Sequence, residues 1–416
     1  MPDGRAGGLD GAGRSALHGL RIADFSRVLA GPYATMLLAD HGADVIKVER
    51  PGIGDDTRAW HPPADRDGTS TYFLSVNRNK RSVVLDLATG AGLEQARALV
   101  AECDVVVENF RPGTMERLGL GPKELRARHP GLIYCSISGF GRGAGAAIPG
   151  YDLLVQAVGG LMSVTGTADG EPVKAGVALV DVITGLHASL GILAALRHRD
   201  VTGEGQLVEV NLLGSLLSAM VNQASAYAVA GVVPGRMGNA HPSIAPYETF
   251  PTADRPIALA VGNDRQFAAL AGVVGNPGLA LDDRFRTNTD RVAHRGELRE
   301  NLTGLLRTAG ADQWSTALLA AGVPAGPVNG LDEAFAFAHQ LGLPGIVEIP
   351  AATAEGASGA PVRQVAHPIT LSATPARYLL PPPRLGQHTE EILHRQVGTS
   401  TDPAPEHTTT TTRSPG

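Results

Sequence analysis

Short apolar strands alternate with helical segments along the first third of the chain, and this alternation restricts the fold more than any other feature. The predicted strands cover residues 21–25, 43–49, 82–87, 103–108 and 132–138, and helical patterns cover 33–40, 93–102 and 115–129. Such alternation is typical of a parallel α/β sheet with helices on its faces. Ligands of these sheets bind beyond the carboxyl ends of the strands. The segments that follow the strands are therefore the first candidates for a binding site.

Basic residues are frequent in those segments, which are 26–32, 49–52, 77–81, 108–113 and 138–141. Any single arginine there has a simpler explanation as a solvated surface charge, but five similar loops at one sheet edge favour a phosphate-rich ligand. No G-x-G-x-x-G follows the first strand and no Gly-Lys dipeptide exists, which argues against a dinucleotide site and a P-loop. No G-x-S-x-G elbow supports a hydrolase serine.

The later chain predicts a second, smaller α+β domain. A long helix is predicted over 212–230, a hairpin over 247–250 and 256–261, helices over 266–273, 291–307 and 311–321, and a last helix over 389–395 capped by Thr389. The predicted organisation is a disordered leader at 1–16, a large domain at 17–225, a small domain at 240–325, a linker and return at 326–396, and a disordered tail at 397–416. Residues 350–361 are mostly small and predict a surface loop.

Asp181 stands between the apolar runs 177–180 and 182–183. A carboxylate between two apolar runs is expected to have a hydrogen-bonding or charged partner, or a function, because burying a charge is costly. The segment alone leaves two interpretations open. Asp181 caps the start of a helix by accepting backbone N–H groups, or it belongs to a functional site.

Charge and cysteine usage narrow the class of protein. The net charge of −6 supplies no general basic field for nucleic acid or an anionic membrane. Cys103 and Cys135 lie in apolar runs without C-x-x-C or H-E-x-x-H spacing, so buried thiols in a reducing compartment are expected rather than metal ligands. The N-terminus lacks the apolar core of a signal peptide, and residues 177–196, interrupted by Asp181 and His187, are expected to form a buried helix rather than a membrane span. A cytoplasmic protein is expected.

Several ordered motifs resemble those of the family III CoA-transferases, which include formyl-CoA transferase, carnitine CoA-transferase and related acyl-CoA racemases. The resemblance covers about residues 17–395. The motifs are 22–25 (IADF) with 30–32 (AGP), 42–52 (GADVIKVERPG), 79–82 (NKRS), 107–113 (VENFRPG), 185–196, 323–329 (VPAGPVN) and 386–389 (GQHT). Each motif alone is weak, but their shared order is specific.

The resemblance implies a Rossmann-like large domain built from both chain ends, a smaller α+β domain and a homodimer of interlocked subunits. It places contacts to CoA on Leu29, Ala30, Arg50, Leu85, Asn109, Phe110, Arg111, Arg117 and Tyr151, with Arg50, Arg111 and Arg117 at phosphates. One position that is often lysine in the family is Ala88 here, which weakens the expectation of a side-chain contact there.

The resemblance also places the family's nucleophile on Asp181. Its carboxylate would attack a donor thioester to give a mixed anhydride, and the released CoA thiolate would return to form an aspartyl-CoA thioester. An acceptor carboxylic acid would then reverse these steps. A helix N-terminus at Asp181 would help to keep the carboxylate ionised. The substrates would be an acyl-CoA and a carboxylic acid, with no metal and no permanently bound cofactor.

Two other functions are weighed against CoA transfer. A racemase of the same superfamily needs a second proton-transfer group, and the family's histidine position is Tyr151 here, a poor base at neutral pH. His187 lies on another helix face from Asp181 and is expected to pack or cap. A non-catalytic CoA-binding protein is disfavoured by the intact Asp181.

The acceptor side is expected within residues 235–247, where formyl-CoA transferase has a run of glycines and this chain does not. The candidate acceptor residues are Arg236, Gly238, Asn239 and His241. Arg236 and His241 would suit a second carboxylate, as in a dicarboxylate donor such as succinyl-CoA.

Overall fold

A computed structural model of the chain describes residues 15–351 and 360–398. Most of the predicted leader, most of the surface loop at 350–361 and nearly all of the predicted tail lie outside the described residues. The chain divides into two compact units. The large unit comprises Met1–Asp152, Leu179–Ser215 and Ile346–Gly416, and the small unit comprises Leu153–Ala178 and Leu216–Gly345. The domain limits expected from the sequence remain a prediction.

A six-stranded sheet forms the centre of the large unit, and every neighbouring pair of strands is parallel. Its order is β3-β2-β1-β4-β5-β6, the order of doubly wound nucleotide-binding sheets. The strands are β1 (Arg21–Asp24), β2 (Asp44–Glu49), β3 (Lys80–Val84), β4 (Val105–Glu108), β5 (Ile133–Ser138) and β6 (Leu207–Asn211). The parallel α/β sheet predicted from the alternation is confirmed. The strand order reverses between β1 and β4, where such sheets bind ligands.

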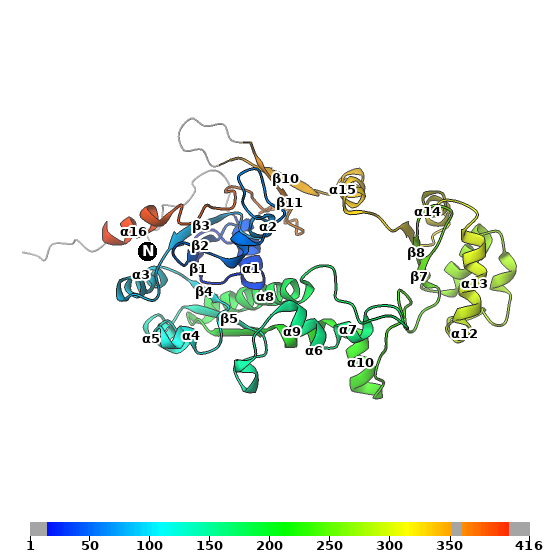
Figure 1. Ribbon diagram of the computed structural model, residues 1–416, viewed down its shortest axis with the longest axis horizontal. Coiled ribbons are helices and arrows are strands. Elements are labelled where there is room, and N and C mark those ends of the chain that lie inside the picture. The colour runs from blue at the N-terminus through cyan, green and yellow to red at the C-terminus, as the bar shows by residue number, and fades with distance from the viewer. Residues whose placement is uncertain (1–14, 352–359, 399–416) are drawn as a thin grey trace, which may run out of the picture. The chain divides into compact units, whose positions relative to one another are not determined.

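Helices cover both faces of this sheet (Figure 1). On one face α1 (Ala30–Asp40) packs against α8 (Leu179–Thr202), which also packs against β5 and β6. The other face holds a buried cluster between the strands and α3 (Gly90–Ala101), α4 (Thr114–Arg117), α5 (Pro122–Arg128) and α16 (Thr389–Gly398). By length and composition α8 is also a candidate membrane span, but its packing against α1, β5 and β6 is that of a core helix.

Shorter elements complete the large unit. They are η1 (Asp56–Ala59), α2 (Thr71–Ser75), η2 (Ala144–Ala147) and the antiparallel pair β10 (Ile346–Ile349) and β11 (Val362–Val365), which the sequence did not predict. The helix α9 (Leu212–Ala219) follows β6.

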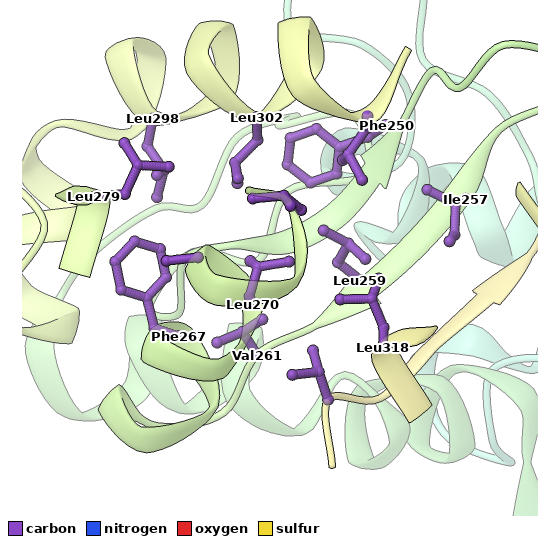
Figure 2. Close-up of a cluster of buried hydrophobic side chains, with 14 of the residues drawn as sticks. Phe250, Ile257, Leu259, Val261, Phe267, Leu270, Leu279, Leu298, Leu302 and Leu318 are labelled. Carbon is purple, nitrogen blue, oxygen red and sulfur yellow. The ribbon is translucent and has the colours of Figure 1, made fainter. Parts of the chain in front are cut away.

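The small unit has its own sheet and core. The antiparallel strands are β7 (Tyr247–Phe250), β8 (Ile257–Ala260) and β9 (Ala325–Pro327), which confirms the predicted hairpin. Figure 2 shows the buried side chains that join this sheet to the helices, among them Phe250, Leu259, Phe267, Leu302 and Leu318. The helices of this unit are α6 (Asp152–Val158), α7 (Leu161–Val164), α10 (Val221–Ala230), α11 (Asp264–Val273), η3 (Pro277–Ala280), α12 (Asn288–Ala293), α13 (Arg295–Leu306), α14 (Ala311–Ala320) and α15 (Leu331–Gln340).

Three predicted helix features are wrong in detail. The helix expected over 212–230 breaks at Met220, where the next residue, Val221, has φ of 35°. The helix expected over 291–307 breaks at His294 into α12 and α13. Thr389 does not cap α16 from outside, because it is the first helical residue and its hydroxyl oxygen accepts the Val84 N–H of β3. An apolar pattern continues through such breaks, so periodicity alone does not reveal them.

Candidate active site

The segments after β1, β2 and β4 lie at one edge of the sheet, and most of the predicted CoA contacts fall there. Leu29 precedes α1 and Ala30 begins it, Arg50 follows β2, and Asn109, Phe110 and Arg111 follow β4. Arg117 ends α4 and is exposed. Leu85 follows β3, but its side chain is only 2% exposed and packs in the core between the sheet and α3. The geometry therefore gives the Leu85 side chain a packing role.

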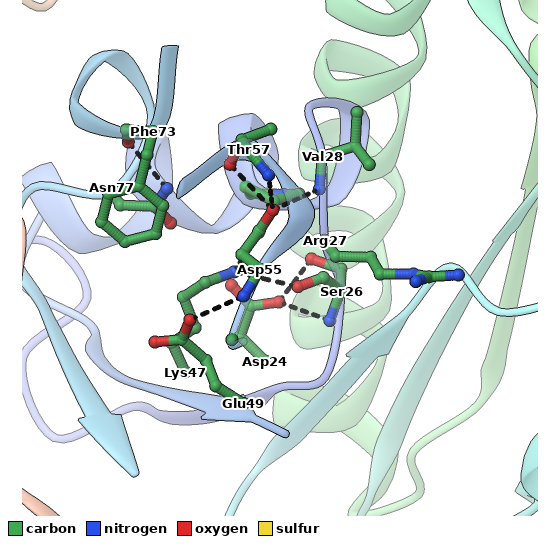
Figure 3. A network of polar contacts seen from close by, with 12 residues as sticks. Asp24, Ser26, Arg27, Val28, Lys47, Glu49, Asp55, Thr57, Phe73 and Asn77 are labelled. Carbon is green, nitrogen blue, oxygen red and sulfur yellow. Dashed lines mark hydrogen bonds and ion pairs between the residues drawn. The ribbon is translucent and has the colours of Figure 1, made fainter. Parts of the chain in front are cut away.

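A charged network is buried beneath this edge (Figure 3). Lys47 Nζ donates to Asp55 Oδ2 at 2.8 Å and to the Ser26 carbonyl oxygen at 3.0 Å. Lys80 Nζ lies 3.2 Å from Asp24 Oδ2 and donates to the Pro32 carbonyl at 2.8 Å. The four charged side chains are at most 3% exposed, and two ammonium groups balance two carboxylates.

The network sets the charge state of its members. Burial alone would raise the pKa of Asp24, but Lys80 and Lys47 outweigh it and the pKa is lowered. Burial would likewise raise the pKa of Asp55, yet Lys47 and the Thr57 hydrogen bonds hold it at about 2. Burial lowers the pKa of Lys80 to about 8. The carboxylates therefore stay ionised at neutral pH and remain hydrogen-bonded to the surrounding loops.

Two exposed arginines share one carboxylate at the same edge. Arg27 Nη1 donates to Asp56 Oδ2 at 2.8 Å, and Arg50 Nη2 donates to Asp56 Oδ1. The Arg27 guanidinium lies 5.8 Å from the centre of the Phe110 ring. Exposed ion pairs of this kind contribute little stability, so both arginines can exchange Asp56 for an anionic ligand at low cost.

Asn109 positions the loop after β1 with both ends of its amide. Its Oδ1 accepts the Arg27 N–H at 2.9 Å, and its Nδ2 donates to the Arg27 carbonyl at 2.7 Å. Arg117 Nη2 donates to Thr114 Oγ1 at 3.1 Å, while Arg111 is exposed. Within the described residues the Arg111 guanidinium makes no hydrogen bond or ion pair.

Asp181 lies in the first turn of α8, and a different aspartate caps that helix. Asp152 Oδ1 accepts the backbone N–H of Val180 at 2.8 Å and that of Asp181 at 3.2 Å. Among the described residues no donor is hydrogen-bonded to the Asp181 carboxylate. The interpretation of Asp181 as the helix cap is therefore wrong, and its side chain is left available for chemistry.

The charge state of Asp181 also differs from the expectation. Burial, and after it the nearby charge of Asp152, raise the pKa of Asp181 to about 7. The expected ionising effect of the helix start does not prevent this, because desolvation disfavours the charged form. A carboxylate with this pKa is half ionised at neutral pH and is a more basic nucleophile than an ordinary aspartate.

Two glycines bring Asp152 to the start of α8. A Cβ added at Gly150 would lie 2.6 Å from the Cα of Gly139, and one at Gly139 would lie 2.5 Å from the Cα of Gly150. The loop after β5 and the segment that leads to Asp152 therefore cross in backbone contact. Tyr151, between them, is 63% exposed.

Asp181 lies one helical turn before the close crossing of α8 and α1. A Cβ added at Gly185 would lie 2.7 Å from the Ala30 carbonyl oxygen. Residues four apart share a helix face, so Asp181 lies on the side of α8 that meets the start of α1. Burial, and then the charges of Asp181, Asp152 and Asp55, raise the pKa of Tyr72 to about 12, which places this phenol beside the same carboxylates.

The His187 side chain, which was expected to pack or to cap, is partly buried and lies against α9. Its Nδ1 is hydrogen-bonded to Ser215 Oγ at 3.0 Å. Across the described residues no group of three or more His, Cys, Asp or Glu side chains is arranged to hold a metal ion.

The predicted acceptor residues lie in the small unit. Arg236 donates to the backbone carbonyls of Thr167 at 3.2 Å and Gly170 at 2.9 Å, and so fastens the turn at 167–170. Gly238 has φ of 64°, and its N–H donates to the Gly166 carbonyl. Asn239 donates to Thr249, and His241 Nδ1 accepts the Ser243 N–H. Their role toward an acceptor remains a prediction.

Sequence reasoning missed several residues of this site, among them Lys47, Tyr72, Asp152 and Gly185. A signal was present for two of them. Lys47 interrupts an apolar strand, which indicates a buried, paired lysine, and Asp152 directly follows a predicted contact. Tyr72 and Gly185 are revealed only by tertiary packing.

Known proteins resemble the chain along nearly its whole length. The sequence model of CoA-transferase family III matches residues 17–389. The succinate–glutarate CoA-transferase of Agrobacterium fabrum is 45% identical over 384 residues, which are 91% of this chain and 94% of that protein. The human succinyl-CoA:glutarate CoA-transferase is 42% identical over 381 residues, covering 91% and 85% of the two chains.

Solved structures also resemble the chain along nearly its whole length. A CaiB/BaiF family protein from Brucella suis is 41% identical, covers 92% of this chain and 100% of its own, and superposes with a TM-score of 0.81. The chain thus combines a doubly wound parallel sheet with an aspartate in the first turn of a core helix, and these relatives match nearly its whole length. The chain belongs to CoA-transferase family III. It is an enzyme of that family, with an acyl-CoA and a carboxylate as substrates.

Proposed function

We propose that this enzyme moves CoA from succinyl-CoA to glutarate or a similar dicarboxylic acid, through a covalent intermediate on Asp181. The observation that carries the proposal is Asp181 itself. It lies in the first turn of α8, its helix is capped by Asp152, and its raised pKa gives a basic carboxylate.

The proposed steps balance without oxidation or reduction. An Asp181 oxygen attacks the thioester carbon, the C–S bond breaks, and CoA leaves as thiolate from a mixed anhydride. The thiolate attacks the Asp181 carbonyl carbon, and succinate leaves from an aspartyl-CoA thioester. Glutarate then attacks that thioester, which releases the CoA thiolate and leaves a mixed anhydride of glutarate and Asp181. The thiolate attacks the glutaryl carbonyl carbon of this anhydride, and glutaryl-CoA forms as the Asp181 carboxylate leaves. Each step is easier than direct exchange, and the enzyme needs no permanent cofactor for it.

The dicarboxylate assignment rests on the relatives. Proteins that share 45% and 42% of their residues with this chain are named for succinate and glutarate. The segment expected on the acceptor side contains a basic residue, Arg236, and the imidazole of His241. A second carboxylate is suited to such groups.

The test is CoA exchange between succinyl-CoA and glutarate with Asp181→Ala and Asp181→Asn. Both variants should fall below about one thousandth of the wild-type kcat, as expected for loss of a nucleophile. The matched control is Asp200→Asn, an exposed aspartate near the other end of α8, which should keep full activity. Hydroxylamine added to the wild type with succinyl-CoA should trap a hydroxamate on Asp181. Unchanged turnover in Asp181→Ala refutes the nucleophile.

Racemisation is the alternative within the family. Incubation with a 2-methylacyl-CoA in deuterated water distinguishes the two reactions. Deuterium at the α-carbon without CoA exchange would support racemisation, whereas CoA exchange without deuterium supports transfer. The exposed Tyr151 at the family's histidine position favours transfer.

We also propose that the active form is a homodimer of interlocked subunits. Leu186, Leu190 and Leu193 on α8 are 44%, 66% and 42% exposed, although α8 is otherwise a core helix. Apolar side chains left exposed along such a helix suit a partner subunit. Light scattering after gel filtration should give twice the chain mass, and a monomer at micromolar concentration would refute the proposal.

A further inference from the structure

Val28 has an unusual backbone conformation in the loop that leads from β1 into α1. Its φ is 70°, in the left-handed region that β-branched residues avoid. Such a conformation costs free energy and persists only where the surroundings enforce it. Strained residues of this kind gather at functional sites.

Side chains hold the peptide groups that lead up to Val28. Asp24 Oδ1 accepts the Ser26 N–H at 2.9 Å, and Lys47 Nζ donates to the Ser26 carbonyl at 3.0 Å. Asn109 bonds both the N–H and the carbonyl of Arg27. Asp55 Oδ1 accepts the Val28 N–H at 3.3 Å. Figure 3 shows Lys47 and Asp55 beneath this loop.

The held loop leads directly to Leu29 and Ala30. Leu29 precedes α1, Ala30 begins it, and the Ala30 carbonyl faces Gly185 on α8. Asp181 lies one turn before Gly185 on the same face of α8. A change in the conformation of Val28 would therefore move the backbone that meets the Asp181 face of α8 at Gly185.

We propose that Lys47 and Asp55 are positioning residues of the reaction, whose buried ion pair keeps Val28 left-handed and thereby fixes Leu29 and Ala30 beside Asp181. The inference rests on the proposed function, because it assigns a role in the chemistry of Asp181. Neither residue touches the reacting atoms, and both act through the loop at 26–30.

The burial of the pair supports a positional role. Lys47 and Asp55 are 1% and 3% exposed, and both also bond the loop backbone. A buried ion pair is often no more stabilising than apolar residues of similar size. What apolar residues could not supply is a donor for the Ser26 carbonyl and an acceptor for the Val28 N–H.

The experiment compares two buried ion pairs of the large unit. Lys47→Met and the double variant Lys47→Met/Asp55→Asn, which leaves no unpaired charge, remove the first pair. The control Arg78→Met breaks the Arg78–Asp40 pair, whose closest atoms are 2.7 Å apart and whose side chains are also buried. Arg78 precedes β3 and so lies at the amino-terminal edge of the parallel sheet, which corrects the expectation that the segment 77–81 follows a strand. Both Lys47 variants should lower kcat about 100-fold and leave KM for succinyl-CoA within about 3-fold, the signature of a misplaced reacting group. Arg78→Met should keep kcat within about 3-fold.

A rescue separates positioning from folding. Glycine adopts positive φ without cost, so Val28→Gly added to Lys47→Met should raise kcat at least about 3-fold over Lys47→Met alone. Equal losses of kcat in Lys47→Met and Arg78→Met would overturn the proposal. A Val28→Gly substitution that changes kcat by the same factor in wild type and in Lys47→Met would also overturn it.

Hydrogen exchange tests the loop independently of activity. Amides of residues 26–28 should exchange faster in both Lys47 variants than in wild type and in Arg78→Met. Unchanged exchange there refutes the inference. If the wild type transfers no CoA between any acyl-CoA and carboxylic acid tested, the proposed function fails, and the exchange result still decides whether the ion pair holds the loop.

Discussion

One carboxylate oxygen of Asp152 accepts the backbone N–H groups of both Val180 and Asp181, so Asp152 caps the helix that carries Asp181. The arrangement has two consequences. It frees the Asp181 side chain from capping, and it places a second negative charge close enough to raise the pKa of Asp181. Asp152 therefore anchors the start of the helix that carries the proposed nucleophile and adds to the effect of burial on its pKa.

The first prediction concerns Asp152→Asn. The amide oxygen still accepts both N–H groups, but the negative charge is gone, so the pKa of Asp181 should fall from its value of about 7. The acid limb of kcat/KM should move to lower pH, because less base is then needed to ionise Asp181. Initial rates from about pH 5 to about pH 9 measure the shift. Glu94→Gln, an exposed charge removed from α3, is the control and should leave the profile unchanged. An unchanged profile in Asp152→Asn contradicts the electrostatic role.

The second prediction is that Asp181→Asn stabilises the protein. The folded-state pKa of about 7 lies above the ordinary value, so the folded form binds the proton more tightly and wild type loses stability as pH rises from about 4 to about 7. Asparagine carries no such penalty. The free energy of unfolding should rise by roughly 2 kcal/mol at about pH 8, and the gain should vanish near pH ~4. Urea unfolding at both pH values measures this, and a destabilised variant at the higher pH would speak against it.

The third prediction concerns Gly185, where α8 approaches α1. An alanine Cβ would lie 2.7 Å from the Ala30 carbonyl oxygen, which is backbone and cannot give way alone. Gly185→Ala should therefore cost about 1 to 3 kcal/mol of stability and lower kcat about 10- to 100-fold by moving Asp181. Thermal unfolding and steady-state kinetics give the two numbers.

The matched control for this variant is Gly304→Ala in α13. Its Cβ would meet nothing within 4 Å, so the change should stabilise the helix by about 0.5 to 1 kcal/mol and leave kcat unaffected. Wild-type kcat in Gly185→Ala would show that the helix crossing does not position Asp181.

Much of the fold of the large unit can be predicted from the local pattern of apolar residues. The apolar runs that became β1, β2, β4 and β5 are short, bounded by turns and separated by helical segments, so the parallel sheet could be predicted. Apolar periodicity carries no information on where a helix breaks, and for this reason the breaks at Met220 and His294 were missed. Strands β10 and β11 form a separate two-stranded sheet, and their local pattern is weak.

The site residues also divide into those that the sequence indicated and those that depend on tertiary packing. Residue type and motif order were enough to single out Asp181 and the loops after the strands. Of the two interpretations left open for Asp181, the helix cap is wrong, because the cap is Asp152, which lies 29 positions away along the chain and approaches α8 beside the Gly139–Gly150 crossing. The pKa of Asp181 likewise depends on burial, which no sequence pattern states.

A histidine pair joins the chain's return segment to the end of α1. The rings of His41 and His367 lie 4.5 Å apart, edge to face. His41 Nδ1 and His367 Nε2 are buried and have no hydrogen-bond partner among the described residues. Burial lowers the pKa of both rings, although the nearby carboxylate of Asp40 opposes the effect. Arg78, which is bonded to Asp40, adds a positive charge that disfavours protonation of His367.

The last prediction is that this pair makes the large unit sensitive to acid. The pKa values of both histidines in the folded protein are below the ordinary 6.5. The unfolded chain therefore binds protons at these histidines more readily than the folded protein does, and stability falls as pH drops below about 6.5. The double variant His41→Asn/His367→Asn keeps an acceptor for the Ile369 N–H and removes the titrating rings. Its free energy of unfolding should depend less steeply on pH between about 5 and about 7 than that of wild type. Urea unfolding at intervals across this range measures the slopes, and parallel curves for the two proteins would rule out the histidine pair as the source of acid sensitivity.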